Sequence, residues 1–164
     1  MSIDASAALW FLPFVVPLCL YTCYTDMARM KITNPTVIAL FAVFAAIGLI
    51  ALPVETYLWR YAHFAVVLVA GIALNAAGVM GAGDAKFAAA AAPFIHLGDL
   101  RLLMLLFAAV LLAAFVAHRT ARATPLTRLA PDWASWHSGA KFPMGLALGG
   151  ALALYLGMGA VYGA

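Results

Sequence analysis

Charged side chains are scarce in this sequence: only 9% of its 164 residues are Asp, Glu, Lys or Arg. A typical soluble domain has about 25% charged and about 45–50% apolar residues. Here 67% of the residues are hydrophobic, which is more apolar surface than a soluble fold of this length can bury. We therefore expect an integral membrane protein. Its net charge of +3 is too small to indicate nucleic acid as a partner, and the lipid bilayer is the expected partner instead.

The motifs of several hydrolase classes are also missing. No His-Glu-x-x-His motif occurs, and the four histidines are scattered, so neither a metal nor a cofactor is predicted. No Gly-x-Ser-x-Gly occurs either, and the serines lie outside the apolar stretches. The only two cysteines, Cys19 and Cys23, are four residues apart and fall on one helix face. We interpret them as small buried residues, since a disulfide within one helical turn has poor geometry.

The N-terminus does not resemble a signal peptide. Asp4 is the only charged side chain before the first apolar run, whereas the basic residues Arg29 and Lys31 follow that run. This order of charges is typical of a first helix that remains in the membrane with its N-terminus outside.

Six apolar stretches predict an all-α, polytopic bundle of six transmembrane helices in a single domain, residues 1–164. They cover residues 7–25, 35–52, 59–80, 85–97, 100–117 and 142–162. The fourth stretch is short and contains Pro93. As a helix it reaches about 20 Å, less than the roughly 30 Å of the hydrocarbon core, so it is either a re-entrant segment or a short crossing.

The distribution of basic residues favours six crossings with both termini outside. In this topology Arg60 and Arg101 lie in outer loops, and the other seven basic residues lie in inner loops. The longest loop, residues 118–141, carries Trp133 and Trp136. Because tryptophan favours the headgroup region, we expect an interfacial inner loop, with a substrate-gripping loop as the alternative.

Two of the six carboxylates stand out. Asp4, Glu55, Asp99 and Asp132 fall in predicted loops as solvated charges or helix caps, and Asp99 is expected to cap the fifth helix. Asp26 ends the first apolar stretch and Asp84 begins the fourth, so the predicted topology places both at inner helix ends. They are either helix-end charges, with Asp26 paired to Arg29 or Lys31 and Asp84 as a cap, or a carboxylate dyad that activates water.

At these residues the sequence resembles the prepilin peptidases, membrane aspartic proteases that include the archaeal preflagellin peptidases. DMARMKITNP (residues 26–35) is similar to the family's Asp motif, although Thr33-Asn34-Pro35 replaces the usual Pro-Asn. GAGDAKF (residues 81–87) is similar to the Gly-x-Gly-Asp-x-Lys block of the family. FPMG (residues 142–145) is a weaker third similarity at the start of the last helix.

The resemblance implies a catalytic pair, Asp26 and Asp84. It implies supporting or substrate-binding roles for a further set of residues: Gly81, Gly83, Lys86, Arg29 and Asn34. The implied reaction removes a short basic leader from a single-span prepilin, with cleavage after a glycine or similar small residue, at the cytoplasmic face of the inner membrane. The long form has a cytoplasmic insertion with paired cysteines and an N-methyltransferase activity. This chain lacks the insertion, so it resembles the short form associated with tight-adherence (Flp) pili, and no methyltransferase activity is expected.

Three alternatives remain open. The first is an archaeal-type preflagellin peptidase. The second is a small transporter that uses intramembrane acids as a relay, which requires polar groups at mid-membrane and inverted repeats. The sequence offers only polar residues such as Asn75 at mid-membrane, and it contains no repeat. The third is a non-catalytic assembly subunit of a secretion complex.

Overall fold

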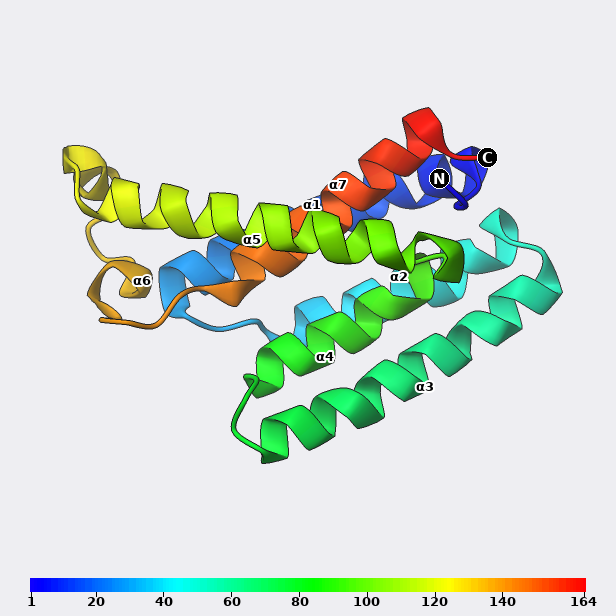
Figure 1. Ribbon diagram of the computed structural model, residues 1–164, viewed down its shortest axis with the longest axis horizontal. Coiled ribbons are helices and arrows are strands. Elements are labelled where there is room, and N and C mark those ends of the chain that lie inside the picture. Colours follow the sequence, from blue (N-terminus) through cyan, green and yellow to red (C-terminus); the bar gives the residue numbers. More distant parts are fainter.

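The chain folds into α-helices joined by short linkers. A computed structural model covers residues 1–164; it is 81% helical and contains no strand. Seven α-helices follow one another along the chain (Figure 1): α1 (Ala5–Arg29), α2 (Asn34–Ala51), α3 (Val54–Ala76), α4 (Ala82–Ala91), α5 (Leu100–Arg122), α6 (Ala134–His137) and α7 (Met144–Tyr162). Short 3₁₀ segments, η1 (Ala92–Phe94), η2 (Leu97–Asp99) and η3 (Pro125–Leu129), connect some of them.

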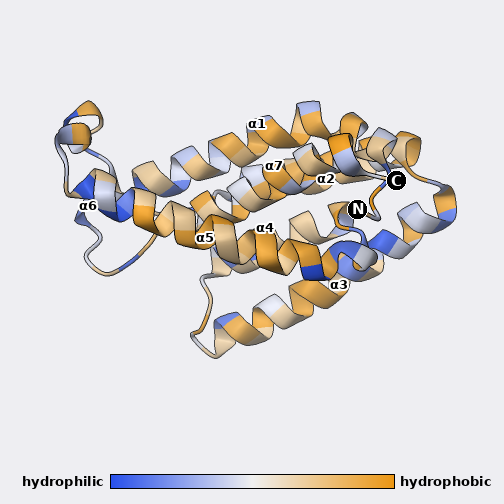
Figure 2. Cartoon of the chain, turned by 45° about the horizontal axis from the view of Figure 1, so that its top comes forward, coloured by the Kyte–Doolittle hydropathy of each residue, from blue (hydrophilic) through white to orange (hydrophobic).

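Five of these helices are long and apolar enough to cross a membrane: α1, α2, α3, α5 and α7. Hydrophobic residues dominate their length, and hydrophilic residues gather around α6 and the adjoining end of α5 (Figure 2). This confirms the predicted all-α polytopic membrane fold. The predicted fourth stretch, residues 85–97, differs: α4 has only ten residues, and Pro93 ends it in the 3₁₀ segment η1. The number of six crossings therefore stays a prediction.

Helices α1 and α7 form the centre of the fold and run antiparallel. A Cβ atom at Gly149 of α7 would come within 2.8 Å of the Cys19 carbonyl oxygen of α1. Because glycine has no Cβ atom, the two backbones can be in close contact here. Both cysteines are free. Cys19 is buried, as the sequence predicted, whereas Cys23 is only partly buried. The two ends of the chain lie side by side, because the Met1 amino group donates to the Tyr162 carbonyl and the Ala164 amide to that of Ile3. Which side of the membrane they face stays a prediction.

A buried aromatic cluster joins α2, α3 and η1 to α1. Phe11, Phe44 and Phe94 contact one another with ring centroids 4.9 to 6.0 Å apart, and Tyr57 stacks on Phe44 at 5.5 Å. Two of these pairs are stacked and two are edge-to-face, and aromatic pairs of either kind add about 0.5–1.5 kcal/mol each to the burial of the rings. The cluster fixes the position of the end of α4.

Arg60 was expected to be a charge in an outer loop, and this prediction was wrong. It lies in α3, is only 5% exposed, and donates hydrogen bonds to the carbonyl oxygens of Pro93 and Ile95. These carbonyls are free because the helix stops at Pro93. Arg60 therefore ties α3 to the end of α4.

Asp99 stands directly before α5 as expected, but its side chain makes no capping hydrogen bond. It accepts instead from the backbone amides of Ser2 and Ile3 at 2.6 and 2.9 Å, and from the Tyr155 hydroxyl at 3.0 Å. Instead of capping α5, Asp99 thus connects η2 to the N-terminal segment and to α7.

The segment predicted as the loop 118–141 begins inside α5, which extends to Arg122, and contains η3 and α6. Trp133 and Trp136 stack with centroids 5.7 Å apart, and Trp136 also stacks on His118. Arg119 and Arg122 donate to the carbonyl of Gly139. These contacts hold the segment against α5 and thereby position the start of α7. Its interfacial and substrate-gripping interpretations both remain predictions.

Candidate active site

Asp26 lies in the last turns of α1 and is 5% exposed. Its Oδ2 accepts a 2.6 Å hydrogen bond from the Gly145 amide at the start of α7, where backbone N–H groups have no helical partner. A Cβ atom at Gly145 would come within 2.9 Å of the Asp26 Cβ. Position 145 thus requires glycine for the two helices to meet. The bond to this amide differs from the pairing with Arg29 or Lys31 that the helix-end interpretation expected.

A residue in the left-handed conformation turns the chain at the end of α1, four residues after Asp26. Met30 has φ 51° and ψ 41°, an unusual conformation for a residue other than glycine, and its N–H donates to the Asp26 carbonyl at 2.8 Å. The turn brings Lys31, Ile32 and Asn34 beside the end of α1. The first motif therefore folds back on its own aspartate.

Asp84 lies in the first turn of α4, outside the five helices that are long enough to span a membrane. The helical conformation ends well before Gly81 and Gly83, since α3 ends at Ala76 and the residue with positive φ in this loop is Gly78, at 72°. Gly81 precedes α4 as its N-cap, and a Cβ atom there would come within 2.7 Å of the Asp84 Oδ2.

Gly83 lies within α4 and serves close packing. A Cβ atom at Gly83 would be 3.3 Å from that of Ile32. The missing side chain lets α4 approach the linker between α1 and α2, and so brings the second motif against the first.

Asp26 and Asp84 line the same cavity, which has a volume of about 790 Å³. Its walls come from the α1–α2 linker, from the α3–α4 loop with the first turn of α4, and from residues 141–144 at the start of α7. All three stretches that carried the family resemblance thus meet at one place. Burial, and then the charge of neighbouring Asp26, raise the pKa of Asp84 from its ordinary 3.8 to about 6. Neighbouring carboxylates with a raised pKa are suited to acid–base chemistry near neutral pH.

The remaining predicted residues divide into two groups. Lys86 Nζ donates to Asn34 Oδ1 at 3.2 Å, so these two join the second motif to the first at the cavity wall. Arg29 is exposed in the last turn of α1 and does not line the cavity. The predicted site residues did not include Lys31 and Lys141, which line the cavity, or Gly145, whose amide holds Asp26. For Gly145 the signal was present in the weak third similarity at residues 142–145.

A comparison with known families agrees with these observations. The profile of the type IV leader peptidase family matches residues 13–118, a segment that contains both Asp26 and Asp84 and ends before α7. No match to a curated protein or to a solved structure was found. Because the family match spans more than half of the chain, the protein belongs to the type IV leader peptidase family and is a protease of the membrane.

Proposed function

We propose that this leader peptidase is an aspartic endopeptidase in which Asp26 and Asp84 form the catalytic pair. The observation that carries the proposal is that both carboxylates, 58 residues apart in the sequence, line one cavity. The substrate class is the prepilin with a short basic leader, and the absence of the long form's insertion favours pilins of the tight-adherence (Flp) type.

The reaction needs only the two carboxyl groups and one water molecule. The ionised carboxylate removes a proton from water, whose oxygen bonds to the carbonyl carbon of the scissile peptide. The protonated carboxyl donates its proton to the carbonyl oxygen, which gives a neutral tetrahedral intermediate. When the C–N bond breaks, the first carboxyl returns its proton to the leaving amine, and the hydroxyl proton of the intermediate goes back to the second. Both groups then regain their starting states.

The environments of the two acids favour different roles. We assign the base to Asp26, because an amide N–H donates to its carboxylate and supports the ionised form. The acid is Asp84, whose raised pKa of about 6 allows it to hold a proton close to neutral pH.

The cavity is assigned to the cytoplasmic side from its charges. Lys31, Lys86 and Lys141 line it, and basic residues gather on the cytoplasmic side of membrane proteins. The inner membrane, with both termini outside, is the corresponding location.

Co-expression with a tight-adherence prepilin tests the proposal, with removal of the leader followed by mass spectrometry. Asp26→Asn and Asp84→Asn are each expected to lower cleavage by about 10²–10⁴-fold while the protein still inserts. The control Asp132→Asn changes an exposed carboxylate away from the cavity and should cleave normally. EDTA should leave the rate unchanged. Wild-type cleavage by either cavity mutant would refute the dyad.

A further inference from the structure

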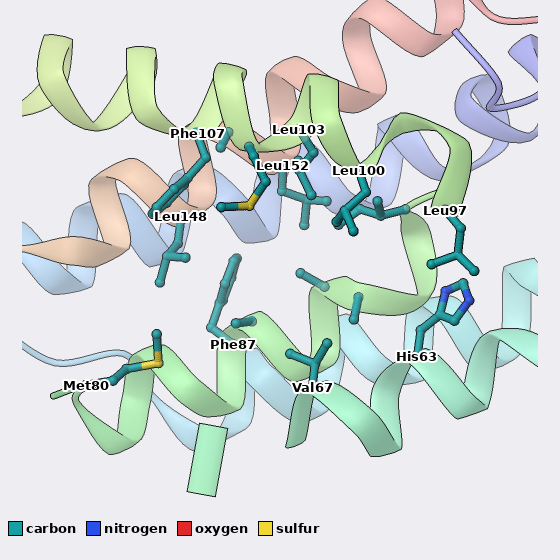
Figure 3. A pocket seen from close by; sticks show the side chains of 16 residues that line it. His63, Val67, Met80, Phe87, Leu97, Leu100, Leu103, Phe107, Leu148 and Leu152 are labelled. Carbon is teal, nitrogen blue, oxygen red and sulfur yellow. The ribbon is translucent and has the colours of Figure 1, made fainter. Parts of the chain in front are cut away.

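A second cavity lies between α3 and α4 on one side and α5 and α7 on the other (Figure 3). Its volume is about 330 Å³, and 15 of its 16 lining residues are hydrophobic, so only an apolar ligand fits it. Phe107 and Leu103 extend into it from α5, and Leu148 extends from α7 toward Phe87 of α4. We call this cavity the apolar groove.

The apolar groove adjoins the active-site cavity. Met80, in the α3–α4 loop directly before the Gly-x-Gly-Asp block, lines both cavities. From Met80 the groove follows α4 to His63 and Leu97 at its far end (Figure 3). Ten residues of α4 correspond to about 15 Å, or nearly three helical turns. One end of a ligand in the groove therefore lies at Met80, at the border of the cavity that Asp84 lines.

One wall of the groove faces outward. No residue in the most apolar 18-residue stretch of α5 is buried, although this stretch has the highest hydropathy of the five spans. Met104, which lines the groove, is 59% exposed. A ligand can thus enter sideways from the bilayer. Within lipid, a polypeptide segment has to be helical to satisfy its backbone hydrogen bonds.

We propose that the apolar groove binds the hydrophobic helical stem of the substrate and so positions the adjoining scissile peptide at Asp26 and Asp84. This inference rests on the proposed function. The floor of the groove includes Ala88, Ala91 and Ala92, small residues that permit the backbone of a second helix to approach. His63 is the only polar lining residue, so an ionised group on the stem would be buried without a partner.

Photocrosslinking tests where the stem binds. The probe is a membrane-embedded precursor with a basic leader, a glycine at the cleavage position and a helix of about 20 apolar residues. The full-length peptidase carries Asp84→Asn, to prevent turnover, and a photoreactive phenylalanine derivative at position 104. The matched control places the derivative at Leu105, which is equally exposed, 63%, but does not line the groove. Crosslinks to the stem are expected from position 104 and to be at least tenfold weaker from 105. Equal yields, or crosslinks from 104 to lipid alone, would overturn the inference.

A filled groove gives a second, kinetic test. Ala88→Trp should lower cleavage of the precursor at least tenfold. It should have a much smaller effect on cleavage of a short peptide that spans the scissile bond but lacks the stem. Ala65→Trp, on an exposed part of α3 outside the groove, should change neither rate. If Ala88→Trp cleaves the precursor as the wild type does, the groove is not the stem site, although the proposed function stands. If the wild type cleaves neither substrate, the proposed function itself fails. If Ala88→Trp loses both activities equally, the crosslinking result decides.

Discussion

Two aspartates of this protein are buried to the same degree and have very different surroundings. Asp99, next to the chain termini, is 4% exposed, and Asp26, near the other end of α1, is 5% exposed. Asp99 accepts hydrogen bonds from two backbone amides and one tyrosine hydroxyl. Asp26 accepts one, from Gly145, and borders a cavity that it shares with a second carboxylate.

This difference separates a structural acid from a candidate catalytic one. A buried carboxylate normally requires several donors to offset the loss of its hydration. Asp99 has them, and its oxygens hold three segments together. Asp26 and Asp84 keep oxygen atoms free for water or substrate. This lowers the stability of the fold, as is common at functional sites. Burial alone therefore does not identify the catalytic acid, whereas the number of donors and the adjoining cavity do.

The largest effect on stability is expected at the structural acid, Asp99. Asp99→Asn leaves fewer acceptors for the Ser2 and Ile3 amides, and hydrogen bonds to a charged group contribute about 1.5–3 kcal/mol each. The variant should lose about 2–3 kcal/mol of unfolding free energy, measured by SDS titration in mixed micelles. Cleavage per folded molecule should stay normal. Glu55→Gln, at an exposed position in the first turn of α3, is the control. An unchanged unfolding curve would show that the three hydrogen bonds do not stabilise the fold.

A smaller effect, on catalysis, is expected at the contact that holds Asp26. Gly145→Ala inserts a methyl group 2.9 Å from the Asp26 Cβ, so the aspartate or α7 has to shift. A displacement of about 1 Å can reduce catalysis up to about 10²-fold, and we expect a loss of about tenfold to a hundredfold in precursor cleavage. Gly157→Ala lies on the same helix with no atom within 4 Å of the added methyl group and should be neutral. Equal rates in both variants would contradict the role of Gly145.

The convergence of Asp26 and Asp84 could be predicted because it follows from few constraints. Apolar stretches, their lengths and the positions of basic residues place two acids at the same depth without any knowledge of packing. The contact between Gly145 and Asp26 could not be predicted in this way. It depends on how closely α1 and α7 approach each other. Several small residues, among them Gly149, jointly determine this distance.

Arg60 and Asp99 show a second limit. A sequence pattern assigns polar residues near helix ends to solvated loops, because most charged residues are exposed. It does not show that Pro93 leaves carbonyls free for Arg60, or that the first residues of the chain return to Asp99. Both interactions connect segments more than 30 residues apart, which periodicity within one helix cannot report.

The smallest expected effect tests the candidate catalytic acid through pH. The pKa of Asp84 is raised to about 6 by burial and by the charge of Asp26, so the folded protein binds this proton more tightly than the unfolded chain, where the pKa is 3.8. The contribution of Asp84 to stability is then lost as pH rises from about 4 through about 6. Asp84→Asn removes this loss, and the variant should unfold at a higher temperature than the wild type above pH 7. The gap should close as the pH falls toward 4, in contrast to Asp99→Asn, which should be the less stable protein above pH 7. Melting curves of purified protein in detergent at pH 4, 6 and 8 would measure the gap. A gap that does not change with pH would mean that the ionised Asp84 carries no energetic cost, and the contrast with Asp99 would lose its physical basis.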